Sequence, residues 1–196
     1  MSHKAIVLDP RGKEEPRESQ VSRRLSTLEG ARLGFLDNLK PNSDMVIDQV
    51  VKRLSERFHL GPTAKRAKAK PTAAAASDIY DELQESDLVV LTLGDCGGCA
   101  AWTIEDAVQL ERRGVPTVTF VTSAFVAMAD ALAKARGIAA LPIVRLPHPF
   151  SQLSADDVRR EVDAVIDRLV EFALSRDIGT AAEHAARAKS KARAAA

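Results

Sequence analysis

Two cysteines stand three positions apart, at Cys96 and Cys99, with Gly97 and Gly98 between them. They follow a continuous apolar run and precede a helical pattern, so they stand where a strand passes into a helix. The first turn of a helix offers free N–H groups and a partial positive charge, which favour thiolate over thiol. The glycines allow a sharp turn and leave space beside the sulfur. The spacing predicts that Cys96 is the exposed nucleophile and that Cys99 resolves a mixed disulfide.

Other chemistry is compatible with this pair. A zinc site would need further ligands, for which Asp95 and His148 are the candidates. One C-x-x-C pair is a weak zinc signal, so we expect no metal. A single catalytic cysteine that forms a covalent adduct without redox cycling stays open, as do two inert buried cysteines. In a reducing compartment we do not expect a permanent structural disulfide at this spacing.

Two more residues are candidates for acid–base work. Asp95 precedes the first cysteine, and His148 is flanked by two prolines that stiffen its backbone. The imidazole could donate a proton to a leaving group, and the carboxylate could act as a base or orient a substrate. Their structural alternatives are a helix-capping carboxylate and a surface loop histidine.

Strand and helix patterns alternate through the middle of the chain. The clearest apolar runs of strand length are residues 32–36, 87–93, 116–121 and 141–146. Helical patterns separate them, and Gly114 and Gly137 stand where two of these helices should end. This order predicts a three-layer α/β/α sandwich with a mostly parallel, Rossmann-like or flavodoxin-like sheet of four or five strands. Residues 63–76 are basic and then alanine-rich, and they show no clear strand.

In a parallel sheet, the loops that follow the strands gather at the carboxyl edge, where ligands bind. A loop rich in turn residues, 37–42, follows the first regular strand. In it, Lys40 and the free N–H groups of the next helix could hold a carboxylate or phosphate, although a plain Asx-type turn with a solvated lysine is the structural alternative. We expect a substrate-binding set at this edge consisting of Asp37, Asn38, Lys40, Asn42, Gly97, Gly98, Thr122 and Ser123.

Composition limits the classes of partner. The chain has 196 residues and a formal net charge of +1, which gives no reason to expect a nucleic-acid or membrane partner. No secretory signal is evident, so we expect a cytoplasmic protein. The turn at the cysteines does not match the dinucleotide fingerprint, so we expect no nicotinamide or flavin cofactor. We expect a folded domain at 30–178, an N-terminal arm at 1–29 with a short strand at 5–8, and a tail at 179–196.

The stretch from Gly94 to Cys99, continued by Trp102 and by residues 106–117, resembles the UGSC family. That family is named for a selenocysteine-Gly-Ser-Cys motif and includes selenoproteins and their cysteine homologues. The loop 36–44 and the exit 146–149 are similar to it too, so the resemblance covers roughly residues 30–154. Selenocysteine would fall at Cys96, and Gly98 stands where the family has serine. A more distant similarity points to the selenoprotein subunits of glycine reductase.

The resemblance implies a redox or nucleophilic role for Cys96, because selenocysteine is placed where an enzyme needs a strong nucleophile. We therefore expect a thiol-dependent enzyme of redox type. The resemblance implies no substrate, and it is the Lys40 loop that makes a small substrate with an anionic group a candidate. One alternative is a lyase, hydrolase or racemase that uses Cys96 alone for covalent catalysis. The other is a non-catalytic subunit or carrier whose terminal arms bind a partner, either a second copy of the chain or a paralogous subunit.

Overall fold

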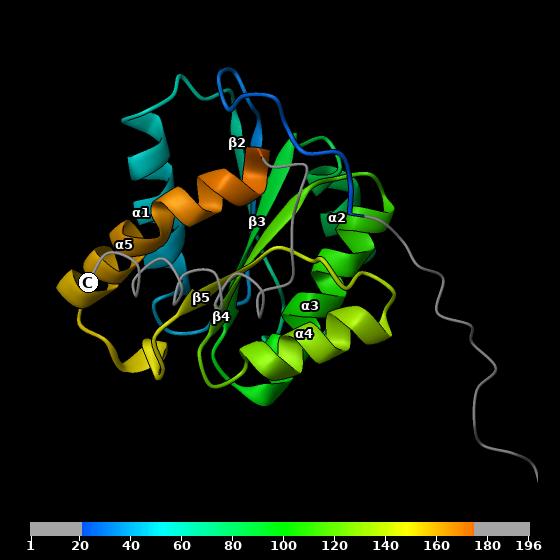
Figure 1. The fold of residues 1–196 in the computed structure, drawn as a ribbon, viewed down its shortest axis with the longest axis vertical. Coiled ribbons are helices and arrows are strands. Elements are labelled where there is room, and N and C mark those ends of the chain that lie inside the picture. Colours follow the sequence, from blue (N-terminus) through cyan, green and yellow to red (C-terminus); the bar gives the residue numbers. More distant parts are fainter. Residues whose placement is uncertain (1–20, 175–196) are drawn as a thin grey trace, which may run out of the picture.

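The computed structural model describes residues 21–174. Strands and helices alternate along this part of the chain (Figure 1). The strands are β1 (Leu33–Asp37), β2 (Thr63–Ala67), β3 (Leu88–Gly94), β4 (Thr117–Thr122) and β5 (Ile143–Leu146). The helices are α1 (Ser43–Ser55), α2 (Ser77–Leu83), α3 (Gly97–Arg112), α4 (Val126–Ala135) and α5 (Ala155–Leu174), with a short 3-10 turn at Phe150–Gln152.

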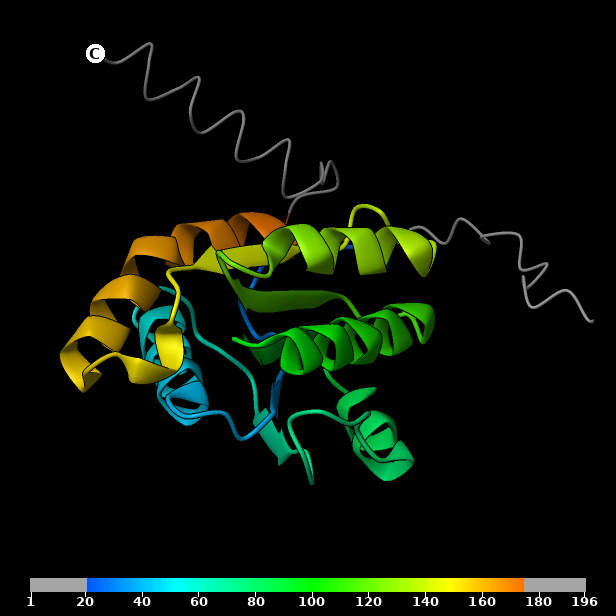
Figure 2. The same ribbon diagram turned by 90° about the horizontal axis from the view of Figure 1, so that it is seen from below.

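The five strands form one parallel sheet in the order β2-β1-β3-β4-β5. Helices α1 and α5 cover one face, and α2, α3 and α4 cover the other (Figure 2). This is the three-layer α/β/α sandwich expected from the sequence, and its strand order is that of doubly wound, flavodoxin-like folds.

Strand β3 lies at the centre of the sheet and is buried along its whole length. Its apolar residues are continuous because both of its faces pack against helices. Val90 contributes to the core beneath α1 and α5, whereas Val89 and Leu91 contribute to the core beneath α2, α3 and α4. The central strand is therefore a rigid support for whatever follows Gly94.

The sequence indicated no clear strand within residues 63–76, but the structure has β2 there, at Thr63–Ala67. The physical reason is its position. As an edge strand that pairs only with β1, it is mostly exposed and has no apolar run. Lys65 and Arg66 on it pair with carboxylates of α1 and α2, and such charges protect an exposed sheet edge from pairing with another chain.

Packed residues precede residue 30, the expected start of the domain. Leu28 is fully buried in the core beneath α1 and α5. Arg24 is buried as well, where it pairs with the Glu111 carboxylate at 2.6 Å and donates to the carbonyl of Thr117. The predicted strand at 5–8 and the tail at 179–196 lie outside the described residues. No helix within residues 21–174 is long and apolar enough to cross a membrane.

The two glycines expected to end helices do so. Gly114 follows α3 and Gly137 follows α4, each with φ of +84°. The N–H groups of Gly114 and Val115 close the end of α3 by donating to carbonyls of its last turn.

Candidate active site

Four loops meet at the carboxyl edge of the sheet, because β1, β3, β4 and β5 are parallel and adjacent in that order. They are the loops at residues 37–42, 94–97, 122–125 and 147–149. Side-chain hydrogen bonds join the last three of these loops to one another. The first loop is bonded to the end of β3 and to the segment that precedes α5. Strands β1 and β3 pair directly, so the loops that follow them are neighbours at this edge.

Cys96 and Cys99 are joined by a disulfide, with their Cα atoms 5.2 Å apart. That separation lies within the usual range for a disulfide, so the turn brings the two sulfurs within bonding reach. Cys96 is the N-cap of α3, and its Sγ accepts a hydrogen bond of 3.2 Å from the backbone N–H of Cys99. The same N–H would stabilise a thiolate on Cys96 after reduction.

The two sulfur positions differ in access. Cys99 is 1% exposed and packs beneath the first turn of α3, whereas Cys96 is partly exposed and Gly98 is exposed. Helix α3 can lie this close to the sheet because of Gly94, since a Cβ there would stand 3.2 Å from the Cα of Ala100. The geometry favours Cys96 as the sulfur that an external molecule reaches first.

Asp95 is buried beside the thiol turn, and both of its carboxylate oxygens are engaged. Oδ1 accepts from the backbone N–H of Phe150 at 3.1 Å and lies 3.1 Å from Nδ1 of His148. Oδ2 accepts from the backbone N–H of Ser151 at 2.9 Å. The carboxylate therefore ties the β3–α3 turn to the segment after β5, which makes it an orienting group rather than a free base.

Burial alone would raise the pKa of the Asp95 carboxyl, but the hydrogen bonds from Ser151 and Phe150 outweigh it, so the pKa lies below its ordinary value. Asp95 is accordingly ionised at neutral pH, and an ionised carboxylate favours the His148 tautomer with its proton on Nδ1.

The ring of His148 is held at several points and is 33% exposed. Besides Asp95, its Nδ1 lies 3.1 Å from the hydroxyl of Thr122, and that hydroxyl lies 3.2 Å from the carbonyl of Gly94, to which it donates. Phe125 packs edge-on against the imidazole, with ring centroids 5.5 Å apart. These polar contacts all involve Nδ1 rather than the other ring nitrogen, Nε2.

In the loop after β1, the side chains of Asp37, Asn38 and Asn42 form hydrogen bonds within the protein. The carboxamide of Asn38 is buried and donates to the carbonyl of Leu93 at 2.8 Å, next to the Thr103 hydroxyl of α3. Asp37 accepts from the hydroxyl of Ser43 and from a backbone N–H of its own loop. Asn42 donates across the edge to the carbonyls of Phe150 and Leu153.

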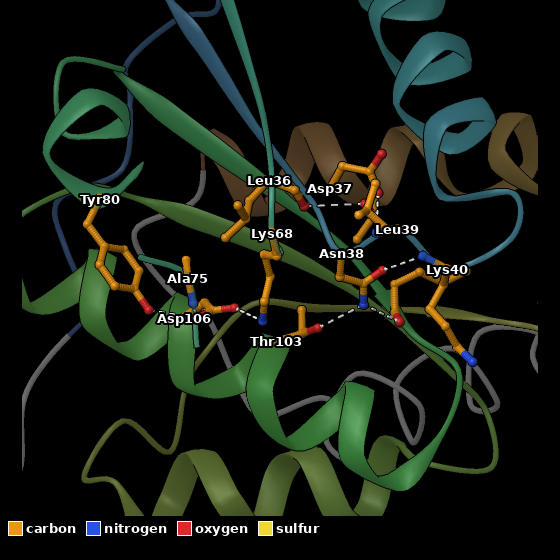
Figure 3. A network of polar contacts seen from close by, with 12 residues as sticks. Leu36, Asp37, Asn38, Leu39, Lys40, Lys68, Ala75, Tyr80, Thr103 and Asp106 are labelled. Carbon is orange, nitrogen blue, oxygen red and sulfur yellow. Dashed lines mark hydrogen bonds and ion pairs between the residues drawn. The ribbon is translucent and has the colours of Figure 1, made fainter. Parts of the chain in front are cut away.

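Lys40 differs from these neighbours. Its side chain is partly buried and extends away from the Asn38 carboxamide (Figure 3). Asn38 accepts only from the backbone N–H of Lys40, at 3.3 Å. The Lys40 ammonium lies apart from the other labelled side chains of this loop in Figure 3. On the β4 loop, Ser123 donates its backbone N–H to Leu146 and is partly exposed.

Sequence reasoning missed several residues around the turn. Phe125 contacts His148 and would lie 3.9 Å from a Cβ built at Gly97, so it bridges the imidazole and the thiol turn. On the other side, Thr72 lies 3.0 Å from a Cβ built at Gly98. Neither belongs to a motif, because each reaches the site through a loop whose course depends on tertiary packing.

A buried ion pair was missed as well. Asp106 of α3 pairs with Lys68, which directly follows β2, and also accepts from the hydroxyl of Tyr80 at 2.6 Å (Figure 3). The spacing of Asp106 could have indicated this pair. Asp106 follows Cys99 and Thr103 at helical spacing, which puts its carboxylate on the buried face of α3, where a charge needs a partner.

Within residues 21–174, no group of three or more His, Cys, Asp or Glu side chains gathers in a way that could hold a metal ion. The histidine and the aspartate that the zinc alternative required are bonded to each other and to the loop after β5.

Comparison with known proteins gives two kinds of similarity, one to solved structures and one to a family model. None of the curated proteins matches this chain. Among solved structures, a short-chain flavodoxin associated with a non-canonical PDU bacterial microcompartment is 11% identical, with a TM-score of 0.37 over 73% of this chain and 97% of the other. A flavodoxin-like domain from Synechococcus sp. is 10% identical, with a TM-score of 0.35 over 72% of this chain and 99% of the other. The model of the UGSC family matches residues 6–175, which include the whole carboxyl edge and its cysteine pair, and the chain therefore belongs to the UGSC family.

Proposed function

We propose that this chain is a thiol-dependent redox enzyme that acts on a small, anionic substrate through its Cys96–Cys99 pair. The observation that carries the proposal is the disulfide at the N-terminus of α3, one sulfur partly exposed and the other buried behind it. That arrangement suits an attacking thiol and a resolving thiol.

The proposed reaction is the reduction of a small disulfide, RSSR. The Cys96 thiolate attacks one sulfur of the substrate, a Cys96–SR bond forms, and RS⁻ leaves. The Cys99 thiolate then attacks Sγ of Cys96, the second RS⁻ leaves, and the protein disulfide forms. The substrate gains two electrons and the cysteine pair loses two, and the two RS⁻ groups take up the protons that the cysteines gave up.

His148 is the proposed proton carrier in both steps. Its Nδ1–H is directed at Asp95 and Thr122, which leaves Nε2 as the basic atom. Nε2 takes the proton from a cysteine thiol before attack and returns it to the departing RS⁻. What supports this assignment is that Asp95, the chain neighbour of Cys96, lies 3.1 Å from Nδ1 of His148, which keeps the imidazole next to the thiol turn.

Trapping tests the assignment of the two sulfurs. With Cys99→Ser, a small disulfide such as glutathione disulfide should leave one glutathione on Cys96, visible by intact mass and peptide mapping. Wild-type protein should pass through this adduct to the internal disulfide, and Cys96→Ser should form no adduct at the same rate. If Cys96→Ser is the variant that accumulates the adduct, the roles are reversed; if no variant reacts, the redox proposal is wrong.

We attribute the proposed preference of the site for anionic substrates to Lys40. This preference can be measured with reagents that differ in charge, before any substrate is known. Iodoacetate and iodoacetamide alkylate a thiolate by the same reaction but differ in charge. Lys40→Ala should lower the ratio of their rates at Cys96 by about threefold, because a nearby positive charge raises the local concentration of an anion. Lys52→Ala, at the far end of α1, is the matched control and should leave the ratio unchanged. An unchanged ratio in Lys40→Ala would remove the anion site from the proposal.

A further inference from the structure

The loop between β2 and α2 is fastened at both of its ends to one carboxylate. Lys68, the first residue after β2, pairs with Oδ2 of Asp106. Ala75, near the start of α2, donates its backbone N–H to Oδ1 at 2.9 Å. Figure 3 shows both ends converging on Asp106 together with the Tyr80 hydroxyl.

We call these contacts of Asp106 with Lys68, Ala75 and Tyr80 the Asp106 clamp. It is buried, since the Lys68 and Asp106 side chains are each 1% exposed. Burial and the hydrogen bond with Asp106 raise the pKa of Tyr80, so its hydroxyl stays neutral and can donate to the carboxylate. Because both ends are fixed, the conformations open to residues 69–74 are limited.

The middle of that loop reaches the thiol turn. Thr72 is exposed, and its Cγ2 would stand 3.0 Å from a Cβ at Gly98, the exposed glycine between the two cysteines. Asp106 and Gly98 belong to the same helix, eight residues apart, which is about 12 Å along its axis. The clamp on the third turn of α3 thus positions a loop over the first.

We propose that the loop 69–74 is a wall of the thiol site, positioned by Asp106, and that the Thr72–Gly98 contact limits the size of the molecule that reaches Cys96. The inference deepens the proposed function, because it concerns the same cysteine. Gly98 matters for this wall because a serine there, as in the family motif, would place its Cβ 3.0 Å from Cγ2 of Thr72, closer than ordinary van der Waals contact. Thr72 and Gly98 are specificity residues in this account, and Asp106 is a positioning residue.

The test compares two alkylating agents with the same reactive group and different size, iodoacetamide and its fluorescein conjugate. On the reduced protein, each forms a bond between Sγ of Cys96 and the CH₂ carbon with loss of iodide, so the reaction does not depend on redox cycling. The measured quantity is the ratio of the two rate constants at Cys96, by peptide mapping, because a ratio cancels any change in thiolate content.

Thr72→Trp should lower the rate for the fluorescein conjugate about tenfold or more relative to iodoacetamide, since bulk at the wall excludes the larger molecule. Gly98→Ser should lower the same ratio by a smaller factor. Ala74→Trp adds the same bulk to an exposed position of the same loop that does not contact Gly98, and it should leave the ratio near that of the wild type.

Weakening the contacts of Asp106 should have the opposite effect and raise the rate for the fluorescein conjugate relative to iodoacetamide. Tyr80→Phe removes one bond to Asp106 while keeping the ring, and it should raise the ratio for the larger agent. Asp106→Asn should raise it further if the variant folds, as judged by its circular dichroism. The inference is overturned if Thr72→Trp and Ala74→Trp give equal ratios, or if Tyr80→Phe leaves the ratio unchanged. Either result would leave the proposed function intact, because that is decided by the trapping of Cys96.

Discussion

At the scale of single residues, the site depends on how Asp95 is used. The sequence identified this carboxylate as a candidate base, but its oxygens accept two backbone N–H groups and face the imidazole of His148. A carboxylate engaged in this way has little capacity left to take a proton from a substrate. Asp95 holds His148 and the segment after β5, and in the proposed mechanism it is His148 that transfers protons.

Asp95→Asn should therefore destabilise the protein at neutral pH by about 1–3 kcal/mol, because the amide offers one acceptor oxygen where the N–H donors of Phe150 and Ser151 need two. The folded-state pKa of Asp95 is depressed below 3.8, so its ionisation stabilises the fold above that pH, and this contribution is lost as the pH falls through the folded-state value. Urea unfolding at several pH values should show the wild type and Asp95→Asn converging below about pH 4. A difference that persists unchanged at acidic pH would mean that the ionised carboxylate is not the stabilising species.

At the scale of secondary-structure elements, the loops of the carboxyl edge are linked across the sheet. Asn42 is the clearest case. It precedes α1 with φ of +71°, and its carboxamide donates to two carbonyls of the segment that precedes α5. The residue therefore has two separate roles: a left-handed backbone conformation and a bridge between the first and last loops of the edge.

Two substitutions separate these roles. Asn42→Gly keeps the backbone conformation and loses the bridge, and it should cost about 1–2 kcal/mol of unfolding free energy. Asn42→Ala loses the bridge and also strains the left-handed backbone, so it should cost about 1 kcal/mol more than the glycine variant. Denaturant unfolding of both variants measures the difference, and equal losses would show that the backbone conformation imposes no strain.

The elements also show what sequence reasoning can and cannot reach. Strand β3, the α3 start at the cysteines and the glycines after α3 and α4 were predictable, because burial, capping and positive φ leave local signals. Strand β2 left none, because an exposed edge strand needs no apolar pattern. The contacts of Thr72 and Phe125 with the thiol turn depend on how distant segments pack, so no local pattern could indicate them.

At the scale of the whole molecule, packed residues precede the start of the domain that composition suggested. The charged segment before β1 reads as an arm, yet Arg24 is buried against Glu111 of α3. Glu111 also accepts from the backbone N–H groups of Ser22 and Thr117, so one carboxylate joins the entering chain, α3 and β4. A charged residue in a polar segment gives no sign that its partner is a buried carboxylate far along the chain.

Arg24→Ala should therefore cost about 3–5 kcal/mol of unfolding free energy, because it leaves the Glu111 carboxylate buried without its cation. The matched control is Arg32→Ala, which breaks the exposed pair with Asp87 and should cost far less unfolding free energy. Urea denaturation of both variants at neutral pH checks this. Similar losses of unfolding free energy in the two variants would mean that Arg24 contributes no more than a surface charge. They would favour residue 30 as the start of the domain.

The central claim is that Cys96 and Cys99 cycle between dithiol and disulfide, and intact-mass measurement of the full chain tests it most directly. Fully reduced protein exposed to a mild oxidant should lose two hydrogens per chain, with the bond mapped between Cys96 and Cys99, and a dithiol should restore the original mass over repeated cycles. Neither Cys96→Ser nor Cys99→Ser should show the two-hydrogen loss. A wild-type pair that stays reduced under the oxidant, or a bond that no dithiol reduces in the folded protein, would contradict the claim.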